Sequence, residues 1–376
     1  MASLGILPEE VMIEILSQLP PESLLRFKCV NKSWNALIND YKFGAKHYSN
    51  SRRRKHVFLW CPRMDTEVNT FSFLELPLSL NSSVSFFDID FSLNEYFRSI
   101  EIIGHSHGLI CLSVCHWDIY LWNPLTTEFR KLPPSIILHP RDSYSSFTRA
   151  IGFGYDSKSM DFKVVRFMGF AKEPEFYYRT RVEIYDLTKD RWREIESPFL
   201  GHRFWKPCFN MCHEGTCYWW GLSEEGIETL ETFDMSDEVF GQISIPEDFD
   251  VIADGPKCLG VFNGSIVVFP YPYKGYDTMF NVWRMGKDEF GGVSWSKILT
   301  IGSVFGIEKA WWIVNSDELF MEINKEGLIS YNNSKSQCLK LPTSCFATAF
   351  VKSLISINRA AKILKCSPPT GSYNLK

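Results

Sequence analysis

The chain has 376 residues, of which 45% are hydrophobic and 22% charged, so its length allows two or three domains and its composition argues against wholesale disorder. Its formal net charge of −4 argues against nucleic acid as a direct ligand, because nucleic-acid-binding proteins usually carry a basic face. No stretch approaches the length of a membrane span and the first residues lack a signal-peptide pattern, so we expect neither.

The first part of the chain predicts a short amphipathic helix. Pro8 suits a first helical position, because the amide it lacks would be unpaired there, and Glu9 and Glu10 favour the positive end of a helix dipole. Across residues 11–19 the apolar residues recur on one helical face. Pro20 and Pro21 then end the helix, since neither can donate to its hydrogen-bond ladder.

Two further short helices are predicted after these prolines. Residues 22–30 form a block that is apolar almost all round, and Asn31 is a good cap for a third helix that carries Trp34. Three short helices cannot bury this apolar area among themselves. Two interpretations follow: the helices pack on the rest of the chain, or they form a docking surface for the helices of a partner.

This N-terminal pattern resembles an F-box of the plant type over residues 4–45. The matching segments are Leu7-Pro8, Ile15-Leu16, Leu19-Pro20, residues 23–30 and Lys32-Ser33-Trp34. The resemblance implies docking to a Skp-type adaptor and, through it, to the cullin and RING subunits of a ubiquitin ligase. The positions it assigns to the adaptor face are Leu7, Pro8, Val11, Ile15, Leu16, Leu19, Pro20, Leu24, Val30 and Trp34. Some of these side chains are expected to be core, and the sequence does not divide them.

A polar, basic junction follows, ending in Ser51-Arg-Arg-Arg-Lys55. We expect a linker over residues 46–55, with a helix end or a short nuclear address as the alternatives. The predicted domains are thus an F-box at 1–45, this linker, a β-rich domain at 56–357 and a loosely ordered tail at 358–376.

Within the β-rich part, one unit recurs: an apolar strand, a polar turn and a second strand. Its aromatic anchors are separated by 63, 48, 50 and 48 residues, and they are Trp122, Tyr185, Phe233, Trp283 and Tyr331. A period near fifty residues with four strands per copy is typical of propeller blades. We place the extra residues of the longest step in an insertion around Phe170–Thr180.

Two strand regions lie outside these five copies, at residues 55–74 and 346–355. We predict that they share a sixth blade, because pairing the two ends of the chain removes an exposed sheet edge. The expected fold is therefore α+β and multidomain: a short three-helix F-box followed by an all-β, propeller-like domain of about six blades.

The β-rich part also has a family resemblance. The segments that carry it are 108–112, 121–124, 152–156, 162–165, 182–185 and 192–194. They are similar to the plant F-box-associated domain, and the nearest similarity is to the S-locus F-box proteins of self-incompatibility. That resemblance implies a receptor in pollen that recognises non-self S-RNases and leads them to ubiquitylation. A different plant protein or glycoprotein cargo is the alternative.

Three motifs suggest chemistry at first sight. Ser106 lies in a G-x-S-x-G match, but a strand pattern follows it where a hydrolase needs a helix, so a propeller hydrolase is only a remote alternative. Gly152-Phe-Gly154 lacks the third glycine of a dinucleotide loop. Two Cys/His groups lack the paired spacing of zinc knuckles: Cys208, Cys212, His213 and Cys217, and His105, His107, Cys111 and Cys115. We therefore expect no catalytic residue, metal or cofactor.

Candidate substrate-binding residues come from loops that mix aromatic and charged side chains, which are frequent at contact hot spots. They are Glu175, Tyr177, Tyr178, Arg179, Arg181, Tyr271, Tyr273 and Tyr276. An acidic segment adds Asp88, Asp90 and Glu95, which would favour a basic partner such as an S-RNase. The alternative is that these are ordinary propeller loops.

Eleven cysteines are scattered without the spacing of a disulfide framework. Together with the lack of a signal peptide, this favours reduced thiols and a cytoplasmic location, with the nucleus as the alternative.

Overall fold

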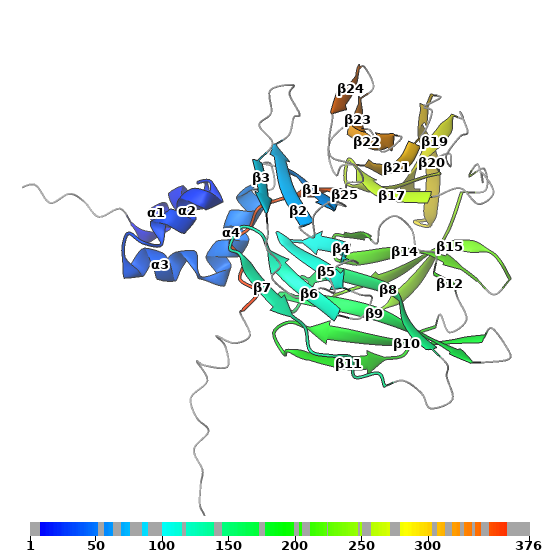
Figure 1. Cartoon of the computed structure of the whole chain (residues 1–376), viewed down its shortest axis with the longest axis horizontal. Coiled ribbons are helices and arrows are strands. Elements are labelled where there is room, and N and C mark those ends of the chain that lie inside the picture. Colours follow the sequence, from blue (N-terminus) through cyan, green and yellow to red (C-terminus); the bar gives the residue numbers. More distant parts are fainter. Residues whose placement is uncertain are drawn as a thin grey trace, which may run out of the picture.

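The computed structural model describes most of the chain (Figure 1). The described residues are 8–51, 56–62, 69–75, 85–88, 100–114, 118–138, 145–172, 177–198, 203–204, 211–223, 225–246, 249, 257–270, 279–302, 307–312, 318–323, 327–332, 335–339 and 346–358. Side chains are described for a subset of these. Among the helices in these ranges, none is both long and apolar enough to cross a membrane.

Four helices open the described chain: α1 (Glu9–Ser17), α2 (Pro21–Phe27), α3 (Lys32–Ile38) and α4 (Tyr41–Ser51). The first three begin within one residue of their predicted starts, although α1 ends at Ser17, before the prolines, and α2 begins at Pro21 and ends at Phe27 rather than Val30. Pro8 directly precedes α1, and Asn31 caps α3 by accepting the Trp34 amide at 2.8 Å.

The fourth helix occupies residues 46–51 of the stretch in which we expected a linker. Asp40 caps it by accepting the amides of Lys42 and Phe43 at 2.9 and 3.1 Å. Lys46 pairs with Glu14 of α1 at 2.6 Å, and the imidazole Nε2 of His47 lies 2.9 Å from the Leu19 carbonyl oxygen. Contacts with α1 thus stabilise this polar segment as a helix. We call α1–α4 the helical unit.

The rest of the described chain forms six antiparallel sheets, arranged as the blades of a propeller. Blade one is β4 (Ile100–Ser106), β5 (Leu109–Val114), β6 (Asp118–Asn123) and β7 (Glu128–Lys131). Blade two is β8 (Ser145–Asp156), β9 (Asp161–Lys172), β10 (Tyr177–Asp186) and β11 (Arg191–Ile195). Blade three is β12 (Arg203–Phe204), β13 (Met211–His213), β14 (Thr216–Leu222), β15 (Glu228–Asp234) and β16 (Phe240–Ser244). Blade four is β17 (Lys257–Phe262), β18 (Ser265–Pro270), β19 (Phe280–Lys287) and β20 (Val293–Ile301). Blade five is β21 (Ile307–Trp312), β22 (Glu318–Ile323), β23 (Gly327–Asn332) and β24 (Lys335–Leu339).

Blade six joins the two ends of the propeller sequence. It contains β1 (His56–Pro62), β2 (Asn69–Glu75), β3 (Ser85–Asp88) and, from the other end of the chain, β25 (Phe346–Phe350). β25 pairs with β1 in antiparallel register, from His56 with Phe350 to Trp60 with Phe346. The predicted closure of the ring is thereby confirmed.

The extra residues of blade two lengthen its central hairpin. β8 and β9 each have 12 residues, and β9 pairs with β10 out to Lys172 and Tyr177. The predicted insertion around Phe170–Thr180 therefore includes the extended ends of two paired strands.

The turns between the last two strands of blades one and three follow one scheme. In blade one, Asn123 Oδ1 accepts the amides of Leu125 and Thr126 at 3.0 and 3.2 Å. In blade three, Asp234 Oδ1 accepts the amides of Ser236 and Asp237, both at 2.8 Å. The first residue of the turn is therefore an Asn or Asp that holds the loop by its side chain.

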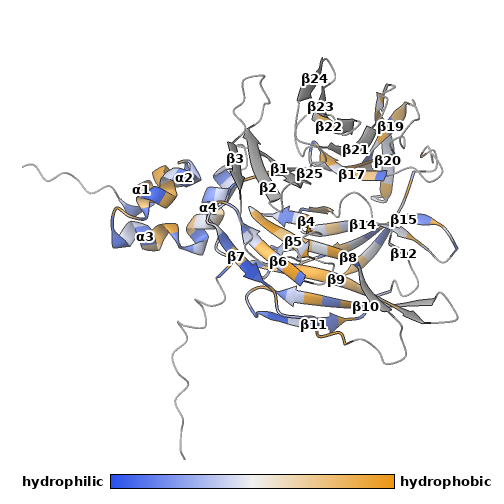
Figure 2. Ribbon diagram, viewed as in Figure 1, coloured by the Kyte–Doolittle hydropathy of each residue, from blue (hydrophilic) through white to orange (hydrophobic). Residues whose placement is uncertain are grey.

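The core lies mainly between neighbouring blades. One cluster joins blades one and two, and similar clusters join blades two and three, three and four, and four and five. Figure 2 shows hydrophobic residues along β5, β8 and β9, whereas β7 at the outer edge is hydrophilic. Gly152 permits close blade packing, because a Cβ there would lie 2.6 Å from the Trp219 ring. This glycine thus serves packing within β8 rather than a nucleotide loop.

Candidate functional site

The helical unit leaves apolar side chains exposed on α1 and in the turn between α2 and α3. Val11, Ile15 and Val30 are 43%, 49% and 58% exposed. Val11 and Ile15 are four residues apart on α1, so they share one face of that helix. We call these three side chains the docking face.

The ten positions predicted for the adaptor face fall into distinct groups. Besides the docking face, Pro8 and Pro20 are exposed, while Leu19 and Trp34 are partly buried. Leu16 and Leu24 are buried, with 3% and 0% of their surface exposed. Leu7 lies outside the described residues. The structure therefore assigns Leu16 and Leu24 to the core of the helical unit.

The buried side of the helical unit is sealed by the chain itself. Leu16, Leu24, Ile38 and Phe43 pack with Leu354, and Leu125 from the β6–β7 turn is partly buried against the same cluster. One side of the apolar helices thus packs on the propeller, as the first interpretation expects, and the other side remains open, so docking to a partner stays a prediction.

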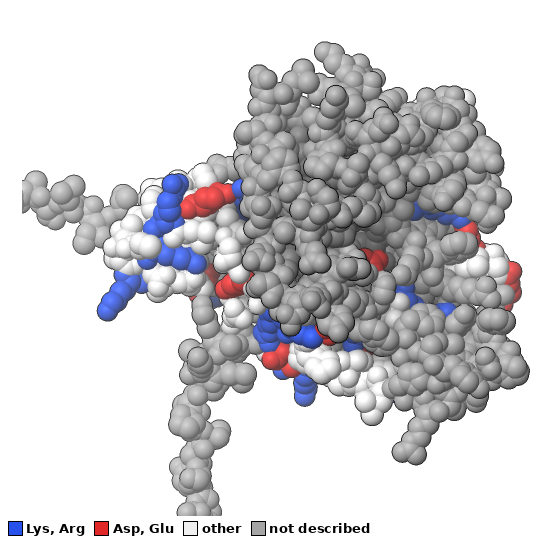
Figure 3. Space-filling model, viewed as in Figure 1, with Lys and Arg blue, Asp and Glu red and all other residues white. Residues whose placement is uncertain are grey.

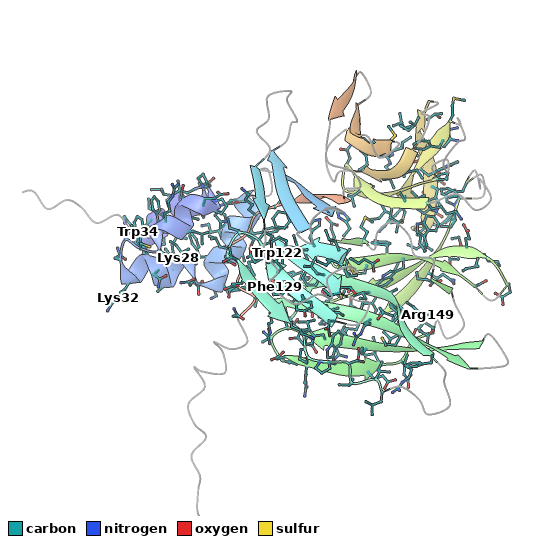
Figure 4. The ribbon with its side chains drawn as sticks, in the orientation of Figure 1. Lys28, Lys32, Trp34, Trp122, Phe129 and Arg149 are labelled. Atoms are coloured by element: carbon teal, nitrogen blue, oxygen red, sulfur yellow. A yellow bond between two sulfur atoms is a disulfide. The ribbon has the colours of Figure 1, made fainter. Side chains whose placement is uncertain are left out.

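Exposed charged residues lie close in sequence to the members of the docking face. Glu9, Glu10 and Glu14 lie on α1, whereas Arg26 and Lys32 are exposed near Val30 in sequence. Figure 3 shows Lys and Arg side chains over the outer part of the helical unit, and Figure 4 shows Lys32 projecting from it. Protein interfaces usually combine apolar side chains with a polar or charged surround, and exposed residues of both kinds are present on the helical unit.

The other side of α4 contacts the end of blades one and two. The Tyr41 hydroxyl is hydrogen-bonded to that of Tyr155. The His107 ring, in the β4–β5 turn, lies 4.6 Å from the Tyr48 ring and 4.2 Å from the Tyr155 ring. The turns of these blades thus meet the helical unit through aromatic contacts.

The described strands that precede the three segments predicted to bind substrate end at one face of the propeller. Antiparallel strands alternate in direction, so the β4–β5 and β6–β7 turns lie at one end of blade one, and their residues His107 and Leu125 contact the helical unit. Blades share one orientation around a propeller axis. Segments 89–99, 173–176 and 271–278 follow β3, β9 and β18, which end at the opposite face. We call this opposite face the far face.

Most candidate substrate-binding residues cannot be placed at the level of side chains. Asp90, Glu95, Glu175, Tyr271, Tyr273 and Tyr276 lie outside the described residues. Asp88 ends β3, and Tyr177, Tyr178 and Arg179 begin β10, where their backbone positions are described.

Arg181 is the candidate whose side chain is described. It pairs with Glu194 of the neighbouring strand, with Nε and Oε1 2.6 Å apart. This hydrogen bond raises the pKa of Arg181 and lowers the pKa of Glu194. Arg181 is one-third exposed, so its guanidinium is held in place while it still faces solvent.

The described part of the far face also carries exposed apolar residues that the sequence analysis did not single out. Leu138 is 78% exposed on the connection from β7 to β8, and Ile227 is 61% exposed on the connection from β14 to β15. Met279, directly before β19, is 66% exposed. Isolated apolar residues in polar turns give no sequence signal, because exposure depends on the packing of neighbouring segments.

The serine of the G-x-S-x-G match lies in a blade turn. Ser106 ends β4, His107 and Gly108 form the turn with φ of 49° and 79°, and β5 follows directly. A hydrolase elbow needs a helix at that point. The geometry thus argues against the hydrolase alternative.

Two cysteines of the possible zinc groups form a different structure. Cys212 and Cys217 face each other across β13 and β14 and are joined as a disulfide. This corrects the expectation of reduced thiols for that pair, because the strand register places the two side chains opposite one another. Cys111 is a free, buried thiol and Cys29 a free, exposed one, and Cys258 is buried. Within the described ranges, no group of three His, Cys, Asp or Glu side chains could hold a metal.

The comparisons with known proteins agree with this two-part organisation. Residues 4–46 match the family model of the F-box domain, and residues 61–357 match that of the F-box associated beta propeller domain. The chain is 29% identical over 346 residues to F-box/kelch-repeat protein At3g23880 of Arabidopsis thaliana, covering 88% of this chain and 89% of that protein. It is 25% identical over 372 residues to F-box protein CPR1 of Arabidopsis thaliana, covering 93% of this chain and 85% of that protein.

Similarity to solved structures is weaker. TolB from Acinetobacter baumannii gives a TM-score of 0.41 at 9% identity, covering 83% of this chain and 73% of that one. The propeller domain of the Trilobed protease from Pyrococcus furiosus gives 0.33 at 9% identity, covering 81% and 97%. Scores this low say nothing about activity. The family matches, by contrast, span most of the sequence: the chain belongs to the F-box proteins that carry an F-box-associated β-propeller domain.

Proposed function

We propose that the chain is the substrate-recognition subunit of a Skp–cullin–F-box ubiquitin ligase. The docking face binds a Skp-type adaptor, which links the chain to the cullin and RING subunits, and the far face of the propeller holds a protein cargo. The observation that carries this proposal is the open set of Val11, Ile15 and Val30 on helices whose other side is sealed.

The chain contributes proximity rather than bond chemistry. A receptor that holds cargo lysines near a charged conjugating enzyme makes ubiquitin transfer effectively intramolecular. The helical unit is already packed on the propeller, so adaptor binding need not order it, and less of the gross contact energy is lost.

The adaptor part is tested by reconstitution with a purified Skp-type adaptor. Replacing Val11 and Ile15 together by Asp buries two uncompensated charges in the interface and should abolish binding. Ile227→Asp is the control, because it replaces an exposed apolar residue by one carboxylate on the far face, away from the helical unit. Retained binding by the double variant, with its fold intact by circular dichroism, contradicts the adaptor proposal.

For the cargo, we propose a non-self S-RNase, with another plant protein or glycoprotein as the second candidate. Support comes from the resemblance of segments such as 121–124 and 152–156 to S-locus F-box proteins. The acidic segment at residues 88–95 would attract a basic ribonuclease. Co-precipitation of the full chain from pollen extract with a panel of S-RNases separates the two candidates. If other proteins are captured and no S-RNase is enriched, an S-RNase cargo is excluded.

A cytoplasmic location stays a prediction. Imaging of a fluorescent fusion in living cells tests it, and an exclusively nuclear signal would contradict it.

A further inference from the structure

A short C-terminal segment joins the helical unit to the propeller. After β25 ends at Phe350, residues 351–358 run between the helices and blade one; we call this segment the strap. Leu354 fills the core of the helical unit, while Ile355 and Ile357 belong to the cluster between blades one and two. Eight residues therefore contribute to two separate cores.

A buried amide fixes the backbone of the strap. Asn123, fully buried at the end of β6, donates through Nδ2 to the carbonyl oxygens of Ser353 and Ile355, at 3.0 and 2.8 Å. The same side chain holds the β6–β7 turn through Oδ1, and Leu125 of this turn contacts the helical unit. One side chain thus ties together blade one, the strap and a turn that supports the helices.

Glu128 fixes the next two residues of the strap. Its Oε1 accepts the Ser356 hydroxyl at 2.8 Å, and its Oε2 accepts the Ile357 amide at 2.7 Å. Gly108 allows the close approach, since a Cβ there would lie 2.2 Å from the Ser353 Cβ. The strap is therefore located by directional bonds as well as by apolar contacts.

From the strap, a salt bridge reaches the helical unit directly. Lys352 Nζ lies 2.6 Å from Glu22 Oε1 of α2, with both side chains partly exposed. The helical unit is thereby held from its core by Leu354 and from its surface by Lys352.

We propose that the strap is the positioning element that sets the angle between the docking face and the far face, with Asn123 and Glu128 as its positioning residues. This inference rests on the proposed function, because only a ligase receptor needs that angle to be fixed. Hydrophobic contacts alone are non-directional. The buried Asn123 side chain donates to two carbonyl oxygens and accepts from two backbone amides, and these four hydrogen bonds form together in one arrangement only. The side chain therefore favours one orientation of the helices.

The decisive variant is Asn123→Asp in the full-length chain. The carboxylate keeps the Oδ1 acceptor that holds the β6–β7 turn, but it faces the carbonyl oxygens of Ser353 and Ile355 without a donor. The matched control is Asp234→Asn, which makes the reverse exchange at the equivalent turn of blade three, where Asp234 plays the same turn role.

The measurement is the distance distribution between two spin labels, attached through an introduced ketone-bearing residue so that native cysteines do not interfere. Suitable sites are Ala36, exposed on α3, and Lys297, exposed on β20. The wild type and Asp234→Asn should give one narrow distribution, and Asn123→Asp should broaden it beyond the spread among replicate wild-type samples. An unchanged narrow distribution in Asn123→Asp overturns the proposal.

A charge reversal keeps the proposal testable if Asn123→Asp fails to fold. Lys352→Glu places like charges side by side at the surface and should broaden the distribution, and adding Glu22→Lys should restore it. Failure to broaden, or failure of the double variant to restore the wild-type distribution, contradicts the role of the strap.

Adaptor affinity is measured on the same samples. If the wild-type chain does not bind the adaptor, the proposed function is refuted. The distances between the spin labels still test the inference about the strap in that case.

Discussion

Two neighbouring residues of α1 separate docking from folding. Ile15 is 49% exposed and Leu16 is 3% exposed. Ile15→Ala removes three carbon atoms, each worth about 0.8 kcal/mol when fully buried. Half of that area is left for a partner to cover, so the variant should weaken adaptor binding by about 1.2 kcal/mol, or roughly eight-fold. Leu16→Ala leaves a cavity in the helical core and should cost about 2–5 kcal/mol of stability.

Two measurements on each variant follow this division. Hydrogen exchange of the α2 and α3 amides reports the free energy of opening of the helical unit, and titration calorimetry with the adaptor reports affinity. In Ile15→Ala the free energy of opening should decrease by only about 1 kcal/mol. The variant loses the contacts of the buried half of the side chain, and the higher helix propensity of alanine offsets part of that loss. Unchanged affinity in Ile15→Ala, or unchanged protection in Leu16→Ala, would refute the assignment of the two faces.

Three further predictions concern the propeller. Burial lowers the pKa of His105 to about 4, so between pH of about 6.5 and 4 the unfolded chain binds a proton that the folded chain does not. The free energy of unfolding should therefore decrease as the pH is lowered across that window, by up to about 1.4 kcal/mol per pH unit. Urea unfolding at several pH values should show a weaker pH dependence of stability for His105→Gln. Gly152→Ala forces a methyl group against Trp219 and should cost about 1–3 kcal/mol, read as a lower thermal midpoint. Glu183→Gln leaves the buried Arg166 without its carboxylate partner, so it should lower the free energy of unfolding by about 3–5 kcal/mol. Urea unfolding measures this change, and an unchanged free energy of unfolding would contradict the importance of the pair.

The blades were predictable because their aromatic anchors occupy an equivalent strand position. Trp122, Tyr185, Phe233 and Tyr331 are each the next-to-last residue of the next-to-last strand in their blade, whereas Trp283 lies in the middle of β19. The first three are buried, with 2%, 0% and 0% of their surface exposed, and Tyr185 and Phe233 belong to clusters between blades. A position that must bury a large ring in every blade leaves a period that a single sequence reveals.

Helix α4 was not predicted because its stability comes from other parts of the chain. Its exposed residues, such as Lys42, Lys46 and Asn50, give it the composition of a linker. Its buried side includes Phe43 in the helical core and Gly44, whose Cβ would lie 3.7 Å from Ile355 of the strap. Local patterns cannot report a helix that depends on residues some three hundred positions away.

The sequence also could not predict which apolar residues of the docking site are buried and which are exposed. Ile15 and Leu16 are both apolar and adjacent, and the helical period tolerates either one on the buried side. Leu354 decides between them, because the strap covers the side of α1 that carries Leu16. For the far face, the topology gathers the predicted segments while the contacts of most of their side chains stay untested predictions.

Pairing of β1 with β25 has a consequence for biosynthesis. The ribosome releases the helical unit first, yet Leu354 and the closing strand β25 are translated only after all the other described strands. A nascent or prematurely terminated polypeptide therefore lacks both the plug of the helical core and the seam of the ring. Completion of the helical core and closure of the ring therefore depend on the same short stretch, residues 346–358.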